Sequence, residues 1–322
     1  MTPADAPDPP VEVGSRTSKD RKIVVLGTGY VGFPLAVMLA RSGFQVVGVD
    51  IRKEIVRSIN DGTLPIREKE IDRIFKEEAV RKNLIGSEHP EPGDVFVISV
   101  PTPLEQRRKV ADLSAVIAAT DSVLPHLRKG NLIVLESTVP PLTCREVIAP
   151  RIESGTSLKV NRDVGLVHCP ERILPGNIFE EIVRNDRVIG SASAEARERA
   201  KAIYGTFVKG RIFLTDDVTA ELVKIMENTY RDVNIALANE FSMIAETLGV
   251  DVGRAIEIAN AHPRVDILRP GIGVGGHCIP IDPWFLTEVD PAHTNLIATA
   301  RRINDSMPER TASTIRKAVA DL

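Results

Sequence analysis

The sequence predicts an α/β protein: a doubly wound parallel sheet of the Rossmann type, followed by a mostly helical domain with one long spine helix. Three observations lead to this prediction. Short β-branched runs alternate with longer stretches of helical period, and the first run leads into a glycine-rich turn. A stretch without Gly or Pro then extends from residue 218 to residue 248.

The alternating region begins at Arg21. We expect strands at Lys22–Leu26, Gln45–Val49, Val95–Val100, Leu132–Leu135, Val164–His168, Val188–Gly190 and Arg211–Leu214. Helical stretches are expected at Val31–Ser42, Arg52–Asn60, Leu113–Leu127 and Ala194–Tyr204. Strands that alternate with helices form βαβ units, and their helices cover both faces of a parallel sheet.

The alternation stops near Thr215, where Asp216 or Asp217 is suited to cap a helix. The stretch Val218–Leu248 then predicts one helix of roughly 46 Å, ended by Gly249. Further helices are expected at Val252–Ala261, His293–Asn304 and Pro308–Asp321. We therefore expect a disordered proline-rich tail at 1–20, a sheet domain at 21–215 and a helical domain at 216–322.

Composition excludes several classes of protein. The 322 residues leave room for about two domains, and 43% hydrophobic with 26% charged residues excludes a disordered chain or a collagen. A formal net charge of −3 argues against general attraction to nucleic acid or an anionic membrane, and no apolar run suits a membrane helix. The first residues lack the pattern of a secretory signal, and three cysteines, an odd number, favour reduced thiols. We expect a cytoplasmic protein.

The first expected strand leads directly into Gly27-Thr28-Gly29-Tyr30-Val31-Gly32 and then into a helix. In this position Gly27 permits a tight turn, Gly29 lets a pyrophosphate approach the backbone, and Gly32 lets helix and strand pack closely. The pattern predicts a dinucleotide site at the helix N-terminus. The alternative is a plain α/β domain whose glycines only form turns.

Asp50 ends the second expected strand, 18 residues beyond Gly32. A carboxylate there accepts hydrogen bonds from ribose hydroxyls and repels a 2′-phosphate, which favours NAD over NADP. The basic residues Arg52 and Lys53 that follow are the feature that argues against this choice.

Three further strands end in loops rich in proline, hydroxyl and carboxylate groups. These loops are Pro101–Pro103, Glu136–Pro141 and Cys169–Gly176. Ligands of open parallel sheets bind outside the carboxyl ends of the strands, so three such loops favour a binding site there. The alternative is a set of rigid turns and caps.

The segment from Pro270 to Trp284 reads PGIGVGGHCIPIDPW. Four glycines in six positions give a backbone that can wrap closely around a ligand, and the thiol of Cys278 is a candidate nucleophile with Asp282 four residues later. No metal site is expected, because His277 and Cys278 have no further Cys or His at ligand spacing. Cys144 and Cys169 are more typical of packing residues.

On the long helix, Lys224 and Asn228 share one face. From spacing alone, Lys224 is either an edge residue whose amine reaches solvent or a partner for an oxyanion.

Together these motifs resemble the UDP-glucose/GDP-mannose (nucleotide-sugar 6-) dehydrogenase family from about Lys22 to the end of the chain. The markers are GTGYVG with Asp50, VPTP at 100–103, ESTVPPLT at 136–143, HCPERILPG at 168–176, AELVKIMENTYRDVNIALANE at 220–240, GVGGHCIPIDPWFL at 273–286 and ARRIND at 300–305. The resemblance implies NAD-dependent oxidation of the C6 alcohol of a UDP-sugar to a carboxylate in two steps. These motifs are most similar to those of the branch that acts on UDP-N-acetyl-D-mannosamine. UDP-N-acetylglucosamine and UDP-glucose are the alternative substrates.

The resemblance also implies roles for individual residues. Cys278 would attack the intermediate aldehyde to give a thiohemiacetal and then a thioester. Lys224 and Asn228 would stabilise the oxyanion, Asp282 and Thr138 would hold the water, and Glu171 would act as a base. Implied substrate contacts are Arg172, Leu174, Lys224, Asn228, Arg231, Arg264, Gly271, Gly273, Gly275 and His277. Implied cofactor contacts are Gly27, Gly29, Tyr30, Val31, Gly32, Asp50, Arg52, Pro101, Thr102 and Thr138.

The implied partners are the UDP-sugar and a second copy of the chain, bound through the long helix, with Arg264 across the dimer interface. Neither nucleic acid nor insertion into a membrane is expected.

Three departures from the family pattern stand out. Pro175 replaces a second Glu that some members carry, and Ile55 stands where a basic residue is frequent. The family's C-terminal UDP-binding domain would begin about where this sequence ends. The interpretations are therefore an active dehydrogenase, a truncated NAD-binding and dimerising protein without turnover, or a related β-hydroxyacid dehydrogenase. The last needs a catalytic Lys but no nucleophilic Cys, so the loop with Cys278 counts against it.

Overall fold

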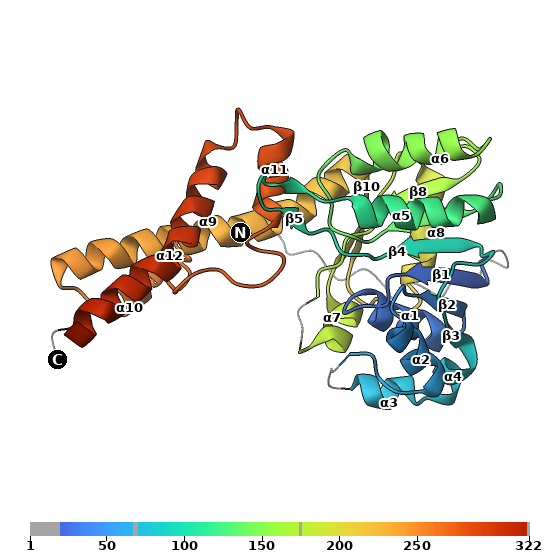
Figure 1. Cartoon of the computed structure of the whole chain (residues 1–322), viewed down its shortest axis with the longest axis horizontal. Helices are drawn as coiled ribbons and strands as arrows, with labels where there is room; N and C mark the ends of the chain where they lie inside the picture. Colours follow the sequence, from blue (N-terminus) through green and yellow to red (C-terminus); the bar gives the residue numbers. More distant parts are fainter. Residues whose placement is uncertain (1–19, 67–69, 174–175, 321–322) are drawn as a thin grey trace, which may run out of the picture.

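A computed structural model describes residues 20–66, 70–173 and 176–320. It has a sheet domain and a helical part that extends away from one side of it (Figure 1). The predicted fold class is confirmed. The strands of the main sheet are β1 (Lys22–Leu26), β2 (Gln45–Val49), β3 (Leu84–Ser87), β4 (Val95–Ile98), β7 (Leu132–Leu135), β8 (Gly165–His168), β9 (Arg187–Gly190) and β10 (Ile212–Thr215).

The sheet has the order β10-β9-β8-β7-β4-β1-β2-β3. All of its neighbouring strands are parallel except β8 and β9, which meet in a single antiparallel pair between His168 and Gly190. The seven expected strands are present. The strand β3 was not expected, because its sequence LIGS is short and contains a glycine. Every strand was expected to be parallel, whereas β9 and β10 run opposite to the rest of the sheet.

Helices cover both faces of this sheet (Figure 1). Alternate residues of β1 point to opposite sides, so Ile23 and Val25 join one buried cluster and Val24 and Leu26 join another. The first cluster lies under α1 (Gly32–Arg41), α2 (Lys53–Asp61), α3 (Ile71–Phe75), α4 (Glu78–Asn83), α7 (Ile178–Arg184) and α8 (Ala194–Tyr204). The second lies under α5 (Ser114–Val123), η1 (Leu124–His126), the π-helix η2 (Cys144–Ile148) and α6 (Ala149–Gly155).

The expected spine helix is α9 (Asp217–Leu248), 32 residues long. The side chain of Asp216 caps it by accepting from the Thr219 amide at 3.1 Å, and Gly249 ends it with φ of 67°. Asp217, the other expected cap, forms an ion pair with Arg145 instead. Among the described residues, no helix is both long and apolar enough to cross a membrane.

The helical part also contains α10 (Val252–Asn260), α11 (Asp282–Val289) and α12 (Asn295–Ala320). Two separate helices were expected on either side of Pro308, but α12 is continuous and carries Pro308 inside it. Buried polar bonds join α12 to α9: Arg301 pairs with Asp232, and Asn304 donates to the Asp232 backbone carbonyl at 2.9 Å. These contacts fix the part of α12 that precedes Pro308 against α9.

A small hairpin connects the two parts of the molecule. Its strands are β5 (Leu104–Glu105) and β6 (Val110–Ala111). Leu104 packs with Ile225 of α9 and Phe285 of α11 in a separate apolar cluster, and the Ala111 amide donates to Glu288 at 2.8 Å. The hairpin therefore fixes α11 against the sheet domain, next to α9.

At the other end of the chain, Asp20 falls within the tail that sequence analysis expected to be disordered. It is buried and accepts from Arg199 of α8 at 2.8 Å. Residues 1–19 lie outside the described residues.

Candidate active site

The glycine turn has the steric properties that the sequence predicted. Gly27 has φ of 87°, and a Cβ there would lie 2.4 Å from the Ser99 carbonyl oxygen. A Cβ on Gly32 would lie 1.9 Å from the Gly27 oxygen, so helix and turn need both glycines. Gly29, in contrast, has no atom within 4 Å of a Cβ position. Its open side leaves space for a ligand at the N-terminus of α1, beside the exposed Tyr30 and the N-cap Val31.

Asp50 lies beside this turn. Its Oδ2 accepts from the amide and hydroxyl of Thr28 at 3.1 and 3.2 Å, and its Oδ1 accepts from the amide and Nε of Arg52 at 3.0 and 3.1 Å. Burial acts to raise the pKa of the Asp50 carboxyl, but hydrogen bonds from Arg52 and Thr28 outweigh it and lower the pKa. Asp50 is therefore held as a carboxylate, and the charge of Arg52 is engaged by it. The neighbouring Lys53 pairs with Glu88 at 3.5 Å.

Hydrogen bonds bring two of the predicted loops together at the ends of β4 and β7. The Ser137 hydroxyl donates to the Val100 carbonyl at 2.7 Å and accepts from its amide at 3.0 Å. Thr102 donates to the Thr138 carbonyl at 2.6 Å. Thr102 and Thr138 are thus adjacent at the carboxyl edge of the sheet, where Pro101 is exposed.

The third loop, after β8, is held by a buried charge cluster. Glu171 accepts from Arg187 at 2.5 Å and from the Arg172 amide at 2.6 Å, so both of its carboxylate oxygens are engaged. Arg187 also donates to Glu136 at 3.2 Å, and Tyr204 donates to Glu136 at 2.8 Å. Burial raises the pKa of Glu136 against the opposing charge of Arg187. In this arrangement Glu171 fixes its loop, and its role as a base stays a prediction.

Arg172 contacts the spine helix. Its Nε donates to Glu227 at 3.1 Å, its Nη1 donates to the Asp186 carbonyl at 2.9 Å, and its Nη2 is also paired with Glu227. Glu227 precedes Asn228 in α9, so this pair joins the third loop to the part of α9 that carries the expected oxyanion residues.

Asn228 and Asp282 form the central contact of the site. Asn228 donates from Nδ2 to Oδ2 of Asp282 at 2.6 Å, and both residues are buried. The Asp282 amide donates to the Cys278 carbonyl at 2.8 Å, which places Cys278 one turn before the start of α11. Burial raises the pKa of Asp282 to about 6, against the hydrogen bond from Asn228 and the charge of Lys224.

Cys278 as a whole residue is exposed although its thiol is partly desolvated, whereas Cys144 and Cys169 are buried, as their expected packing roles require. Desolvation raises the pKa of the Cys278 thiol and the charge of Asp282 adds to the rise, whereas Lys224 and Arg231 lower it. Cys278, Lys224, Asn228, Arg231 and Asp282 therefore lie within electrostatic reach of one another, although α9 and the glycine loop are far apart in sequence.

The glycine loop itself is held by three asparagines that sequence analysis did not single out. Asn234 and Asn239 of α9 accept from the amides of Leu268 and Gly271 at 3.0 and 2.9 Å. Asn260 exchanges two hydrogen bonds with the backbone of Ile267. Asparagine is uncommon inside helices, so these residues could have been noticed in the sequence. The sequence does not indicate, however, which backbone groups their side chains bind.

The remaining predicted contacts are exposed or lie on the loop. Gly273 has φ of 145° and packs toward Pro308, and Gly275 has an open Cβ position. His277 and Arg264 are exposed, and Arg264 lies in the segment that follows α10. The structure does not place Arg264 beside Cys278. Leu174 and Pro175 lie outside the described residues.

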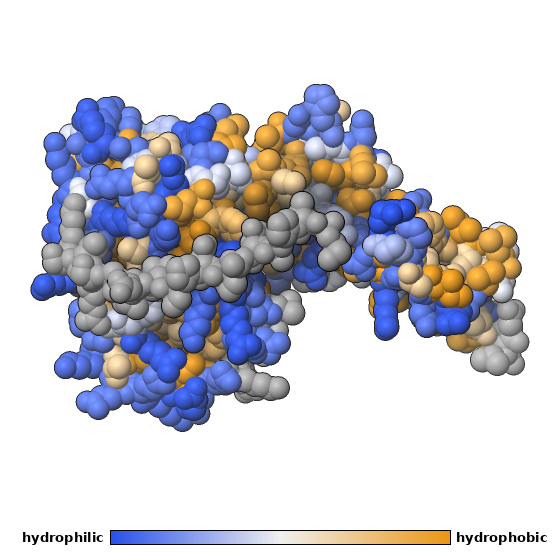
Figure 2. All heavy atoms as spheres, turned by 180° about the vertical axis from the view of Figure 1, so that it is seen from behind, coloured by the Kyte–Doolittle hydropathy of each residue, from blue (hydrophilic) through white to orange (hydrophobic). Residues whose placement is uncertain are grey.

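One face of the helical part is apolar. Along α9 the exposed side chains Met226, Tyr230, Leu237, Phe241, Ile244 and Leu248 recur at spacings of three, four and seven, and so form one stripe. Together with Val250 and Ile258 near α10, we call this set the spine face. Figure 2 shows apolar residues gathered over the helical part, away from the sheet domain.

Comparison with known proteins gives the family. Residues 21–208 match the NAD binding domain, and residues 218–306 the central domain, of the UDP-glucose/GDP-mannose dehydrogenase family. The chain is 49% identical over 301 residues to the UDP-N-acetyl-D-mannosamine dehydrogenase of Methanocaldococcus jannaschii, which covers 93% of this chain and 69% of that protein. The chain belongs to the UDP-glucose/GDP-mannose dehydrogenase family.

Solved structures of related enzymes are similar to this chain, and two of them illustrate it. The structure of UDP-N-acetylmannosamine dehydrogenase from Pyrococcus horikoshii aligns with a TM-score of 0.89 at 47% identity, covering 93% of this chain and 72% of that one. The corresponding enzyme from Staphylococcus aureus aligns with a TM-score of 0.86 at 44% identity, covering 94% and 71%. The chain thus spans about 70% of the length of these relatives.

Proposed function

We propose that the chain oxidises the C6 alcohol of a UDP-N-acetylhexosamine to a carboxylate, with UDP-N-acetyl-D-mannosamine as the preferred substrate and NAD as the oxidant. The observation that carries this proposal is the group formed by Cys278, Asp282, Asn228 and Lys224 across two segments of the helical part. Relatives at 48–49% identity are named as UDP-N-acetyl-D-mannosamine dehydrogenases, which supports the choice of sugar.

The glycine turn fits NAD. The open side of Gly29 leaves space for a pyrophosphate, and the Asp50 carboxylate beside the turn repels a 2′-phosphate. When bound there, the cofactor supplies a hydride acceptor beside the strand-end loops. The ion pair between Arg52 and Asp50 also favours NAD. The guanidinium is already paired, and so it is not free to bind the 2′-phosphate of NADP.

The site residues account for the chemistry of the two oxidations. An aldehyde lacks an alkoxide from which hydride can leave, and attack by the Cys278 thiolate on its carbonyl carbon supplies one as a thiohemiacetal. In this proposal Lys224 and Asn228 stabilise that oxyanion, which the charge of Lys224 near Cys278 and the contact of Asn228 with Asp282 support. Loss of hydride leaves a thioester, and Asp282 takes a proton from the water that cleaves the C–S bond and releases the thiol.

The spine face supports a homodimer. An exposed apolar stripe on a long helix is typical of an interface, and burying it against a second copy removes it from water. The resemblance to the family points to the same helix.

The test is an assay of NADH formation with UDP-N-acetyl-D-mannosamine, UDP-N-acetylglucosamine and UDP-glucose at equal concentrations. We expect the first to give the highest kcat/KM and a uronate product. A higher kcat/KM for UDP-glucose would overturn the choice of sugar. No NADH from any of the three, with NAD binding intact, would favour the interpretation of an NAD-binding and dimerising protein without turnover.

A further inference from the structure

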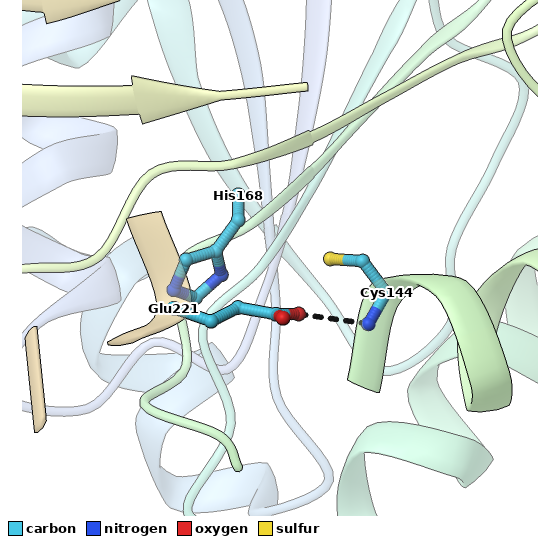
Figure 3. Close-up of side chains that lie close together, drawn as sticks. All are labelled: Cys144, His168 and Glu221. Carbon is cyan, nitrogen blue, oxygen red and sulfur yellow. Dashed lines mark hydrogen bonds between the residues drawn. The ribbon is translucent and has the colours of Figure 1, made fainter. Parts of the chain in front are cut away.

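Cys144, His168 and Glu221 lie together in the interior of the molecule. They come from the π-helix η2, from the end of β8 and from the first turns of α9. All three are buried, and one ligand atom from each lies within 4.8 Å of the other two. Figure 3 shows the Cys144 sulfur on the side of η2 that faces the imidazole, with the Glu221 carboxylate close to both residues. Three elements of the fold therefore meet at one set of donor atoms.

The His168 ring is the unusual member of this cluster. It has no exposed surface, and within the described residues neither ring nitrogen makes a hydrogen bond of good geometry, although the Leu135 backbone carbonyl lies close to the ring. A buried polar group without a partner costs free energy, so the position needs a reason. In its neutral form a buried imidazole has one nitrogen with a free lone pair. A neutral imidazole is the form that binds metal ions.

Glu221 is already oriented. Its two oxygens accept from the amides of Cys144 and Leu142 at 2.8 and 2.7 Å. Each oxygen keeps a second lone pair, so these bonds fix the carboxylate without using up its capacity as a ligand. Such outer hydrogen bonds are usual around the carboxylates of metal sites.

We propose that Cys144, His168 and Glu221 form a three-ligand zinc site that joins the sheet domain to the spine helix. Thiolate, imidazole and carboxylate are the usual zinc ligands. The thiol proton is released on binding, so that Zn²⁺, one thiolate and one carboxylate sum to zero charge in a site without solvent exposure. Tetrahedral zinc ligands lie about 3.3–3.7 Å apart, so the donors need to approach by at most about 1.5 Å. A water completes the fourth position.

The first test is metal content. The full chain is treated with a chelator, dialysed, and titrated with Zn²⁺ against a competing chromophoric chelator. We expect one Zn²⁺ per chain in the wild type. His168→Asn, which keeps a polar side chain, and Cys144→Ser are each expected to bind at least about tenfold more weakly. Cys278→Ser removes the thiol of an exposed residue and is the matched control, with unchanged zinc affinity. Equal affinities in all four proteins would overturn the proposal.

A second test avoids variants that fail to fold. X-ray absorption of the zinc-loaded Cys278→Ser protein is expected to show one sulfur at about 2.3 Å and nitrogen or oxygen ligands at about 2.0 Å. A shell of nitrogen and oxygen alone, or a chain that retains no zinc, would contradict the site. Neither test depends on the proposed oxidation, because both measure bound metal in the absence of substrate.

Discussion

Asn228 on the spine helix donates a hydrogen bond of 2.6 Å to Asp282 at the start of α11, and both residues are buried. This bond joins two segments separated by more than fifty residues, and the turn before α11 brings the Cys278 thiol to the same place. The position of the proposed nucleophile relative to its oxyanion and proton-transfer partners follows from this contact.

The charges around Cys278 set its reactivity. Asp282 raises the pKa of the thiol and Lys224 lowers it, so Asp282→Asn is expected to increase the thiolate fraction near neutral pH and Lys224→Met to decrease it. We expect changes of roughly threefold to tenfold in the rate of alkylation by iodoacetamide. The measurement is the pH profile of alkylation at Cys278, read by peptide mass spectrometry. Cys144 and Cys169 are internal controls, because both are buried. Identical profiles for both variants would contradict the assigned electrostatics.

Asp282 gives stability a pH dependence of definite sign. Its pKa is about 6 in the folded chain and lower when unfolded, so the folded state binds the proton more tightly. The free energy of unfolding should therefore fall as the pH rises from about 4 to about 6. The Asp282→Asn variant lacks this loss. Its free energy of unfolding, relative to that of the wild type, should therefore be about 2–3 kcal/mol higher at pH 7 than at pH 4. Urea unfolding across this range measures it, with the exposed Asp266→Asn as the control; parallel curves for all three proteins would refute the assignment.

Two substitutions in the glycine turn distinguish an effect on NAD binding from an effect on stability. Gly29→Ala adds a methyl group where no protein atom lies within 4 Å, so the fold should tolerate it while the approach of a pyrophosphate is blocked. We expect NAD affinity by calorimetry to fall by about tenfold or more, with little change in Tm. Gly32→Ala would place its Cβ 1.9 Å from the Gly27 oxygen and should lower Tm as well. Unaltered NAD binding by Gly29→Ala would argue against a cofactor at this turn.

The buried charge cluster predicts a large effect on stability. Arg187 is the cation between Glu136 and Glu171, with only 4% of its side chain exposed. Arg187→Met removes the cation that the two buried carboxyl groups share. The free energy of unfolding should therefore fall by about 3–5 kcal/mol. Arg211→Met is the matched control, because Arg211 pairs with Asp186 at 3.2 Å but is 80% exposed. Its cost should stay below about 1 kcal/mol. Comparable small losses in both variants would contradict the assigned role of Arg187.

The spine face predicts the oligomeric state. Ile244 is 55% exposed on α9, and Ile244→Asp places a charge in the proposed interface. Light scattering should show a dimer for the wild type and a monomer for this variant. Ile85→Asp, at a side chain 52% exposed on β3, serves as the control and should remain dimeric. A wild-type monomer, or a dimer that survives Ile244→Asp, would remove the spine face as the interface.

The sequence predicted features that local chemistry determines. The turn at Gly27–Gly32, the ends of the spine helix at Asp216 and Gly249, and the strands follow from short patterns whose physical causes are local. The exposed Cys278 beside Lys224 was expected through the family resemblance rather than from spacing. The spacing alone did not decide whether Lys224 is an edge residue whose amine reaches solvent or a partner for an oxyanion.

Contacts across long stretches of chain were missed. Nothing in the sequence pairs Asn239 with the Gly271 amide or Arg187 with Glu136, because such pairs depend on how helices and strands pack. The same holds for the zinc site proposed above: spacing excluded a metal at His277 and Cys278, whereas His168 approaches Cys144 only in the folded sheet. Pro308 led to an error of another kind. Two separate helices were expected there, whereas α12 is continuous and contains the proline.

The central claim is that Cys278 forms a covalent intermediate in an oxidation of four electrons. The direct measurement compares wild type and Cys278→Ser with UDP-N-acetyl-D-mannosamine and NAD, following NADH by absorbance and the sugar product by mass spectrometry. NAD affinity and thermal unfolding of both proteins establish that the variant is folded. The account predicts about two NADH per uronate for the wild type, and no uronate from Cys278→Ser although it binds NAD normally. Uronate formation by Cys278→Ser at the wild-type rate would contradict it.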